Sequence, residues 1–447
     1  MSSVDAIAAY NRRLQDDPAA TLAQAAWLQE TFRRSGVLFA GAPMQSFLRP
    51  HLVGRADWLL LRDVGRRILE LAVRVARDAF DGDAARLCDY LGTPEAEARW
   101  VVLDPGAPDV VLSRLDAFLT PEGPRFIEIN SDAPAGFGYG DRMAEAFQQL
   151  PLFRAFAREH PVAYHPSAPA LVDAVRRAYR ARAGAGSPCV AIADWAEVKT
   201  RADQEILREA FEAQELRCVL ADPREMELRG GRLVAGEQAI DVVYRRGVLS
   251  ELVEREDEVR DFLAAYRAGC ALFVNSFRCR LSEDKAFFAL LTDEAFAPLL
   301  SGEERELALR HLPWTRKLEE RRTLLDGRSV DLVPFVLEQQ ASFVLKPAHG
   351  YGGRSVFVGD ETPPADWAAA VAAGIGRPWV VQQRVPIPEE PFPVCEAGVL
   401  RFESLKVNVN PFYVAGAEVG AVTRASRSSV INVSAGGGSV PTFVVEE

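Results

Sequence analysis

Residues 113–136 constrain the fold of this chain more than any other segment. They contain two short runs in which apolar and polar residues alternate, on either side of a Pro-Glu-Gly-Pro turn at 121–124. Turn residues between two alternating runs predict a β-hairpin. Positions i and i+2 of a strand point to the same face, so Glu128 and Asn130 project together, and pairing across the turn can bring Asp116 beside them.

The polar face of this hairpin can be interpreted in two ways. It is either a strand face in contact with water or an all-oxygen site for a hard cation such as Mg²⁺, which proteins usually bind beside nucleotide phosphates. The apolar residues between the polar positions favour buried strands, in which polar groups need a partner or a function. These apolar residues are Leu115, Phe126, Ile127 and Ile129.

The composition of the chain excludes several classes of protein. Its 447 residues are 48% hydrophobic and 26% charged, which is typical of a globular chain with two or three subdomains. The net charge of -11 argues against a nucleic-acid surface, although a basic cleft for a small anion is compatible with it. The first residues lack the apolar core of a signal peptide, and no apolar run reaches the roughly 18–20 residues of a membrane span. We therefore expect a cytoplasmic protein with neither nucleic-acid nor membrane partners.

The six cysteines and five histidines are scattered along the chain, without CxxC or HExxH spacing. Neither a disulfide framework nor a metal site of histidine and cysteine ligands is therefore expected. The sequence also lacks the glycine–lysine motif of P-loop proteins and the GxSxG motif of α/β-hydrolases, so these two classes have no support.

The pattern of the sequence divides the chain into three parts. Residues 1–168 show helical periodicity at 19–34 and 56–80, and they include the hairpin and a Gly-rich turn at 135–140. Residues 169–275 follow a boundary rich in Pro and Ala, and their short apolar strands alternate with helices. This alternation predicts a parallel, Rossmann-like α/β subdomain, although without a GxGxxG motif we do not expect it to bind a dinucleotide.

The third part, residues 276–447, begins with helices and ends with strands. Helices are expected at 284–291, 318–325 and 334–340. Apolar strands separated by glycines follow at 342–347, 355–359, 379–385, 404–410 and 418–424. The expected fold class of the whole chain is therefore α/β (α+β).

The strand at 342–347 is the first candidate for a phosphate site. It carries Lys346, with glycines at positions 350, 352 and 353. A lysine can hold a phosphate as a point charge, and glycines allow backbone N–H groups to close over phosphates. The alternative is a glycine hairpin with an exposed lysine. Lys285 is likewise either a second phosphate contact or a solvated helix residue.

Two further strands complete the pattern. The apolar strand at 379–385 runs into a Pro-rich turn and can present backbone groups to the edge of an adenine. Arg424, at the end of a later strand, could neutralise the charge on a transferring phosphoryl group.

Together these pieces resemble an ATP-grasp ligase in circularly permuted order. The lysine–glycine hairpin, the adenine strand, the strand pair ending in Arg424 and the stretch 429–438 follow one another as usual, but the ExN motif, normally last, comes first. The pairs Arg114/Asp116 and Glu128/Asn130 are similar to the RxD and ExN motifs in the synthetase domain of glutathionylspermidine synthetase. The resemblance implies a circularly permuted ATP-grasp fold with a Rossmann-like subdomain and a helical N-terminal region.

The resemblance also implies a role for each candidate residue. Asp116, Glu128 and Asn130 would hold Mg²⁺, and Arg114 and Arg424 would stabilise the transferred phosphoryl group and the oxyanion of the next step. The residues implied in binding ATP are Lys285, Lys346, Gly350, Gly352, Gly353, Gln382, Gln383, Val385, Glu389 and Asn432. Glu390 is an alternative to Glu389 for the ribose, and Asp132 and the turn at 136–140 are expected near the acceptor site.

The implied activity is ATP- and Mg²⁺-dependent ligation of a small-molecule carboxylate to an amine through an acyl phosphate. Phosphoryl transfer needs positioning and charge neutralisation more than a protein nucleophile, so the lack of a Ser/His or Cys/His pair is compatible with it. Two alternatives stay open: a kinase-like ATP-grasp phosphotransferase and a catalytically silent nucleotide-binding protein. The sequence shows no amidase domain and assigns no role to His349 or Tyr351. The sequence does not determine which carboxylate and amine are the substrates, whether the nucleotide is ATP or GTP, or whether the protein forms a homodimer.

Overall fold

The computed structural model describes residues 2–104, 106–183, 186–350, 355–415, 419–433 and 436–446. Among these residues, the largest sheet has eight strands. Six of them lie in the order β3-β23-β22-β21-β4-β5, while β20 pairs with β21 and β6 pairs with β23. Their bounds are β3 (His51–Gly54), β4 (Leu112–Thr120), β5 (Gly123–Asn130), β6 (Val162–Ala163), β20 (Glu389–Glu396), β21 (Val399–Val414), β22 (Ala421–Ser426) and β23 (Gly438–Val445).

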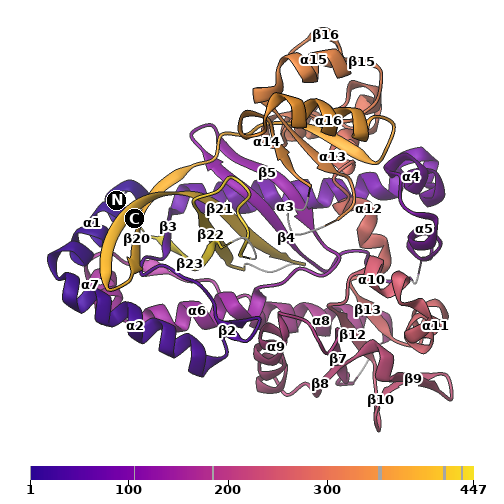
Figure 1. The fold of residues 1–447 in the computed structure, drawn as a ribbon. Coiled ribbons are helices and arrows are strands. Elements are labelled where there is room, and N and C mark those ends of the chain that lie inside the picture. Colours follow the sequence, from indigo (N-terminus) through magenta and orange to yellow (C-terminus); the bar gives the residue numbers. More distant parts are fainter. Residues whose placement is uncertain are drawn as a thin grey trace.

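The hairpin predicted from residues 113–136 forms at one edge of this sheet. β4 and β5 pair antiparallel, and the other side of β4 pairs with β21, where Phe412 lies opposite Arg114. Figure 1 shows the purple hairpin beside the yellow strands from the C-terminal part of the chain. Strands from the two ends of the sequence thus form one sheet, as a circular permutation requires.

Helices from the first third of the chain cover this sheet, with α3 against β5 and α6 against β23. Gly65 lets α3 approach β21 closely, because a Cβ there would lie 1.7 Å from the hydroxyl oxygen of Tyr413. That hydroxyl donates a hydrogen bond to the carbonyl of Leu61 at 2.9 Å. The helices of this part are α1 (Ser3–Asp16), α2 (Pro18–Ser35), α3 (Arg55–Asp78), α4 (Ala84–Leu91), α5 (Glu95–Val101), α6 (Phe137–Gln149) and α7 (Pro151–Glu159). Two short strands, β1 (Leu38–Phe39) and β2 (Ala42–Pro43), pair with each other between α2 and α3.

The Gly-rich segment 135–140 differs from the expected turn. Gly136, with a φ of 105°, precedes α6, but Phe137–Gly140 form the first turn of that helix. The carboxylate of Asp203 accepts hydrogen bonds from the amides of Gly136 and Tyr139, each at 3.0 Å. A carboxylate at this position satisfies amides that have no partner within the helix, so it stabilises the helix start.

The parallel subdomain predicted from the alternating pattern is confirmed. Its strands lie in the order β13-β12-β7-β8, and all neighbours are parallel. The strands are β7 (Val190–Ala193), β8 (Cys218–Ala221), β12 (Val242–Arg245) and β13 (Leu272–Val274), with a small antiparallel sheet of β9 (Met226–Arg229), β10 (Arg232–Ala235) and β11 (Gln238–Ala239). The helices are α8 (Ala168–Ala183), α9 (Arg201–Ala213), α10 (Leu249–Glu254) and α11 (Arg260–Ala268).

The remaining lobe, orange in Figure 1, contains an antiparallel sheet in the order β14-β19-β17-β18. Its strands are β14 (Thr315–Lys317), β17 (Phe343–Pro347), β18 (Phe357–Val358) and β19 (Trp379–Gln383). The helices that precede or flank them are α12 (Arg280–Glu283), α13 (Phe287–Thr292), α14 (Gly302–His311), α15 (Leu332–Glu338) and α16 (Pro364–Gly374). Within the described residues, none of the helices in this molecule combines the length and the apolar character needed to cross a membrane.

One helix prediction in this lobe is wrong, and the helix predicted at 284–291 begins three residues later than expected. Residues 318–325 do not form a helix; β15 (Arg322–Leu325) instead pairs with β16 (Arg328–Asp331) around Asp326 and Gly327, whose φ angles are 48° and 76°. Two positive φ angles in an Asp-Gly pair are typical of a tight hairpin turn. Lys285 does not open a helix either, because it lies between the end of α12 and the start of α13.

Candidate functional site

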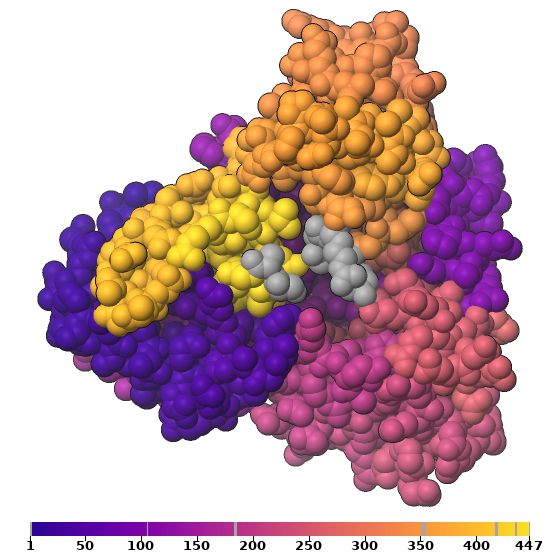
Figure 2. Space-filling view, viewed as in Figure 1, coloured from indigo at the N-terminus to yellow at the C-terminus, as the bar shows by residue number. Residues whose placement is uncertain are grey.

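A cavity of about 650 Å³ lies between the hairpin β4–β5 and the orange lobe. Figure 2 shows the lobes of the molecule meeting around a central recess. One wall is polar and comes mainly from the hairpin, and another is apolar and comes from the orange lobe and the segments after it. The apolar residues include Val344, Val358, Val385, Ile387 and Ile431.

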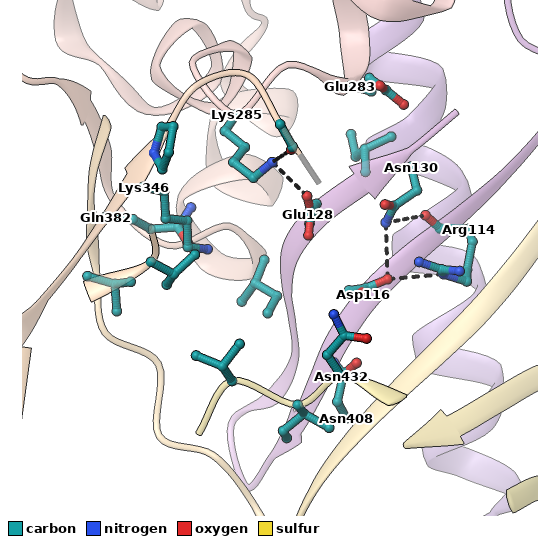
Figure 3. A pocket seen from close by; sticks show the side chains of 18 of the residues that line it. Arg114, Asp116, Glu128, Asn130, Glu283, Lys285, Lys346, Gln382, Asn408 and Asn432 are labelled. Atoms are coloured by element: carbon teal, nitrogen blue, oxygen red, sulfur yellow. Dashed lines mark hydrogen bonds and ion pairs between the residues drawn. The ribbon is translucent and has the colours of Figure 1, made fainter. Parts of the chain in front are cut away.

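The hairpin places the predicted polar triad together at this cavity. Asp116 lies directly opposite Glu128 in the strand register, and Arg114 lies opposite Asn130. The amide of Asn130 donates to Oδ1 of Asp116 at 3.1 Å, and Nε of Arg114 donates to the same oxygen at 3.3 Å. Figure 3 shows these side chains on one face of the purple strands.

Cations approach the two carboxylates from three directions. Nζ of Lys285 lies 2.9 Å from Glu128, and Nη1 of Arg424 lies 3.2 Å from Oδ2 of Asp116. Nζ of Lys346 donates to Oε1 of Gln382 at 2.8 Å, so this lysine is held by a neutral side chain rather than by a carboxylate. Lys285 and Lys346 come from the orange lobe and Arg424 from β22, so the site exists only where the lobes meet.

The electrostatics of the site favour an anionic ligand. Burial lowers the pKa of Lys346 to about 8, although Glu128 opposes this shift. Burial and the charge of Arg114 lower the pKa of Arg424 to about 10. Burial would raise the pKa of Glu128, but the neighbouring lysines more than offset it, so that this carboxylate is held ionised. The charges of Lys346 and Arg424 are therefore incompletely compensated by nearby negative charge, whereas for Lys285 burial lowers the pKa and Glu128 raises it by more.

Comparison with known families identifies the family of the chain. A sequence model of circularly permuted ATP-grasp type 2 proteins matches residues 105–426. The chain belongs to this family. The family predicted from the order of the motifs is thereby confirmed, and the match spans both the hairpin and the lysine-bearing lobe.

One solved structure shares the fold of this chain, and a second is more distantly similar. A glutathione synthetase-like effector from Globodera pallida, in its apo form, aligns over 96% of this chain and 98% of its own, with a TM-score of 0.65 and 12% sequence identity. A putative gamma-glutamylcysteine synthetase from Methylobacillus flagellatus aligns over 85% of each chain, with a TM-score of 0.41 and 11% identity. No curated protein sequence matches the chain.

The side chains that line this cavity fit a nucleotide triphosphate with Mg²⁺. Four cations, Arg114, Lys285, Lys346 and Arg424, line the cavity around the two carboxylates of the hairpin, which leaves positive charge for phosphates. In nucleotide sites Mg²⁺ is usually held by one or two carboxylates together with the phosphates. Within the described ranges no cluster of three or more His, Cys, Asp or Glu side chains is arranged to hold a metal without such help.

The predicted adenine strand lines the cavity with residues 382–385. The amide of Gln383 donates to the carbonyl of Trp314, and that of Arg384 donates to the carbonyl of Ser342, each at 2.8 Å. Both amides are therefore already hydrogen-bonded to carbonyl groups within the lobe. The side chain of Gln382 accepts a hydrogen bond from Lys346, and Val385, after the end of the strand, lines the cavity.

The other predicted ATP-binding residues fall into three groups. Gly350 and Asn432 line the cavity. Glu389 does not belong to the described lining residues; it lies on β20 and accepts a hydrogen bond from the hydroxyl of Ser404 at 2.8 Å. Its alternative, Glu390, is paired with the buried Arg49 at 2.7 Å, which is a structural role. Gly352, Gly353 and the unassigned Tyr351 lie outside the described residues.

The ATP-grasp cavity continues past Glu128 into a region that sequence reasoning largely missed. Glu283 accepts hydrogen bonds from the amides of Ser131 and Asp132 and pairs with Arg280 at 2.6 Å. Burial raises the pKa of Glu283, and Arg280 opposes this shift. Asp132, expected near the acceptor site, lines the cavity and is paired with the fully buried Arg245 at 2.5 Å. No local motif marks Glu283, because the two amides that donate to it lie about 150 residues away in the sequence.

Proposed function

We propose that this protein is an ATP- and Mg²⁺-dependent carboxylate–amine ligase that acts on small molecules. Membership in the ATP-grasp family supports ATP-dependent ligase chemistry in general. The observation that carries the proposal is the placement of Lys285, Lys346 and Arg424 around the opposed carboxylates of Asp116 and Glu128. This combination suits phosphates and a divalent cation together better than it suits either alone.

The proposed reaction has two steps. A carboxylate oxygen of the first substrate attacks the γ-phosphorus of ATP, the bond to the β-phosphate oxygen breaks, and ADP leaves behind an acyl phosphate. The amine nitrogen of the second substrate then attacks the acyl carbon. The carbon–oxygen bond to phosphate breaks, so the products are an amide, inorganic phosphate and a proton. Both steps require positioning and charge neutralisation rather than a protein nucleophile.

Each charged residue of the site has its own role in this reaction, set by its position. Lys285 and Lys346 hold phosphate oxygens, and Arg424 and Arg114 neutralise the charge that moves to the transferred group and then to the oxyanion. Asp116 and Glu128 would hold Mg²⁺, which would supply further charge neutralisation at the phosphates. The contacts of Arg114 support its role, because Nη1 donates to the carbonyl of Ala135 at 3.0 Å, which fixes the guanidinium beside the acceptor region.

Thermal unfolding with ATP, Mg²⁺, MgATP and MgGTP tests the nucleotide site. A ligand at about 100 times its dissociation constant adds roughly 2.7 kcal/mol to the free energy of unfolding, which gives a clear rise in Tm. We expect the rise with MgATP, and its loss in Asp116→Asn. Asp257→Asn, at an exposed pair with Arg260, serves as the matched control. No rise with any nucleotide would overturn the proposal.

Release of inorganic phosphate then separates the ligase from its alternatives. Wild-type protein should release phosphate only when a suitable carboxylate and amine are both present, and Glu128→Gln should abolish turnover while the fold remains intact. A stable phosphorylated product formed without amine would indicate a phosphotransferase. Binding of MgATP without turnover over a broad set of carboxylate–amine pairs would indicate a silent nucleotide-binding protein.

A further inference from the structure

The residues that follow β17 are tied to two other parts of the molecule by His349. Its Nε2 lies 2.7 Å from the carbonyl oxygen of Gly92, and its Nδ1 lies 2.6 Å from Oδ2 of Asp284. Gly92 caps the C-terminus of α4, and Asp284 directly precedes Lys285. One imidazole ring thus joins the N-terminal helices, the segment that carries Lys285 and the end of the strand that carries Lys346.

Both partners of this ring are hydrogen-bond acceptors. A carbonyl oxygen and an ionised carboxylate have no proton to donate, whereas a neutral imidazole has a single N–H. In either neutral tautomer, one ring nitrogen would turn its lone pair toward an oxygen 2.6 or 2.7 Å away. The imidazolium ion carries an N–H on both nitrogens, so the two distances suit the protonated ring, with a hydrogen bond from Nε2 to Gly92 and an ion pair, not a well-aligned hydrogen bond, from Nδ1 to Asp284.

We propose that protonated His349 is a positioning residue for ATP binding. Its ring links Asp284 to Gly92, an arrangement called the clasp below, and thereby holds Lys285 in place for the phosphates. This inference rests on the proposed ATP site. It assigns a role to a histidine that the sequence motifs left unexplained.

The clasp acts on Lys285 through short links on either side of His349. The backbone amide of Lys285 donates to the carbonyl of Ala348 at 3.4 Å, and its Nζ donates to the carbonyl of Gly350 at 2.8 Å. The same Nζ lies 2.9 Å from Glu128. If the segment at 284–285 moved away from the end of β17, the backbone of Lys285 would move with it. The ammonium group of Lys285 would then no longer lie where it is needed to bind phosphate.

The charges around the ring decide when it is protonated. Burial lowers the pKa of His349, but Asp284 and the carbonyl of Gly92 raise it by more, so the pKa lies above its ordinary value. Arg280, on α12, opposes this rise. Lys285 is a further nearby cation, next to Asp284 in the chain. As the pH rises through the pKa of His349, the ring loses one N–H and with it one side of the clasp.

The dissociation constant of MgATP, measured by calorimetry from about pH 6 to pH 9, tests this role. His349→Gln should bind MgATP roughly three- to tenfold more weakly than wild type at the low end, which is less than the loss of a charged hydrogen bond to the phosphate itself, because His349 acts only through Lys285. The ratio of the two dissociation constants, variant over wild type, should approach one as the pH rises and the wild-type ring becomes neutral. A ratio that stays constant over this range overturns the positioning role. His160→Gln, outside the residues that line the cavity, should follow wild type throughout.

Nitrogen NMR of the histidine rings gives a readout that needs no ATP. The signal lost in His349→Gln should remain that of imidazolium above the ordinary histidine pKa of about 6.5, and Asp284→Asn should shift its titration to lower pH. Titration of His349 at or below about 6.5 overturns the clasp. If the ring stays charged but wild type binds no nucleotide at any pH, the proposed function fails and the protonated clasp stands.

Discussion

Arg424 lies 3.2 Å from Asp116, although 308 residues separate them in the sequence. Arg424 is on β22 and Asp116 on β4, and β21 pairs with both strands and so holds the two side chains on one face of the sheet. The ion pair therefore depends on the spatial order of the strands in the large sheet. It places a catalytic candidate beside a metal-binding candidate.

Replacement of Arg424 should affect the reaction more than the fold. In Arg424→Gln we expect kcat to fall by about 10²- to 10³-fold, because a preorganised donor to the developing charge is lost. Phosphate release under saturating substrates measures this. Arg427→Gln is the matched control, since Arg427 is an exposed residue that pairs with Glu403 and Glu396. Equal kcat values in the two variants would exclude Arg424 from catalysis.

Lys346→Ala should weaken ATP binding. Loss of one charged hydrogen bond to phosphate costs about 1.5–3 kcal/mol, which corresponds to a roughly 10- to 100-fold rise in the dissociation constant of MgATP. Calorimetry with Lys199→Ala, an exposed lysine outside the cavity lining, provides the comparison. An ATP affinity unchanged from wild type would remove Lys346 from the site.

The lowered pKa of Lys346 also predicts a pH dependence of stability without ligand. Its pKa is about 8 in the folded protein and ordinarily about 10.5, so between these values the unfolded chain binds the proton and the folded protein does not. Stability rises with pH wherever the unfolded state binds more protons, by at most roughly 1.4 kcal/mol per pH unit for one group. Relative to Lys346→Met, wild type should therefore gain free energy of unfolding in urea from pH 8 to 10. A constant difference would contradict the lowered pKa.

Asp203→Asn should lower stability and activity together. The carboxylate is fully buried, pairs with Arg246 at 3.3 Å and caps the start of α6. Breaking a buried pair leaves an uncompensated charge and costs about 3–5 kcal/mol. Arg246 also donates to the carbonyl of Pro134, next to the residue that holds Arg114, so kcat should fall as well. Urea unfolding and phosphate release measure both, and Asp257→Asn should change neither.

The short-range parts of the site were predictable from the sequence. Asp116, Glu128 and Asn130 belong to two strands joined by a tight turn, so strand alternation and a short loop are enough to place them on one face. The family followed from the order of such local motifs. The hairpin at 322–331 was predictable too, because Asp326-Gly327 is a strong turn signal, but the charged run before it was interpreted as a helix.

That hairpin shows how tertiary contacts override local propensity. Glu294, from another part of the lobe, accepts a hydrogen bond from the amide of Leu324 at 2.9 Å and pairs with Arg316. These partners are distant in sequence, and no pattern within 318–325 reveals them.

The sequence by itself therefore determined the ATP-grasp family, the polar hairpin face and the identities of the candidate cations. Only the tertiary structure decided which charges meet: Arg424 with Asp116, Lys285 with Glu128, and His349 with Asp284. The physical reason is that periodicity and turn chemistry act over a few residues, whereas ion pairs between lobes depend on the packing of whole sheets.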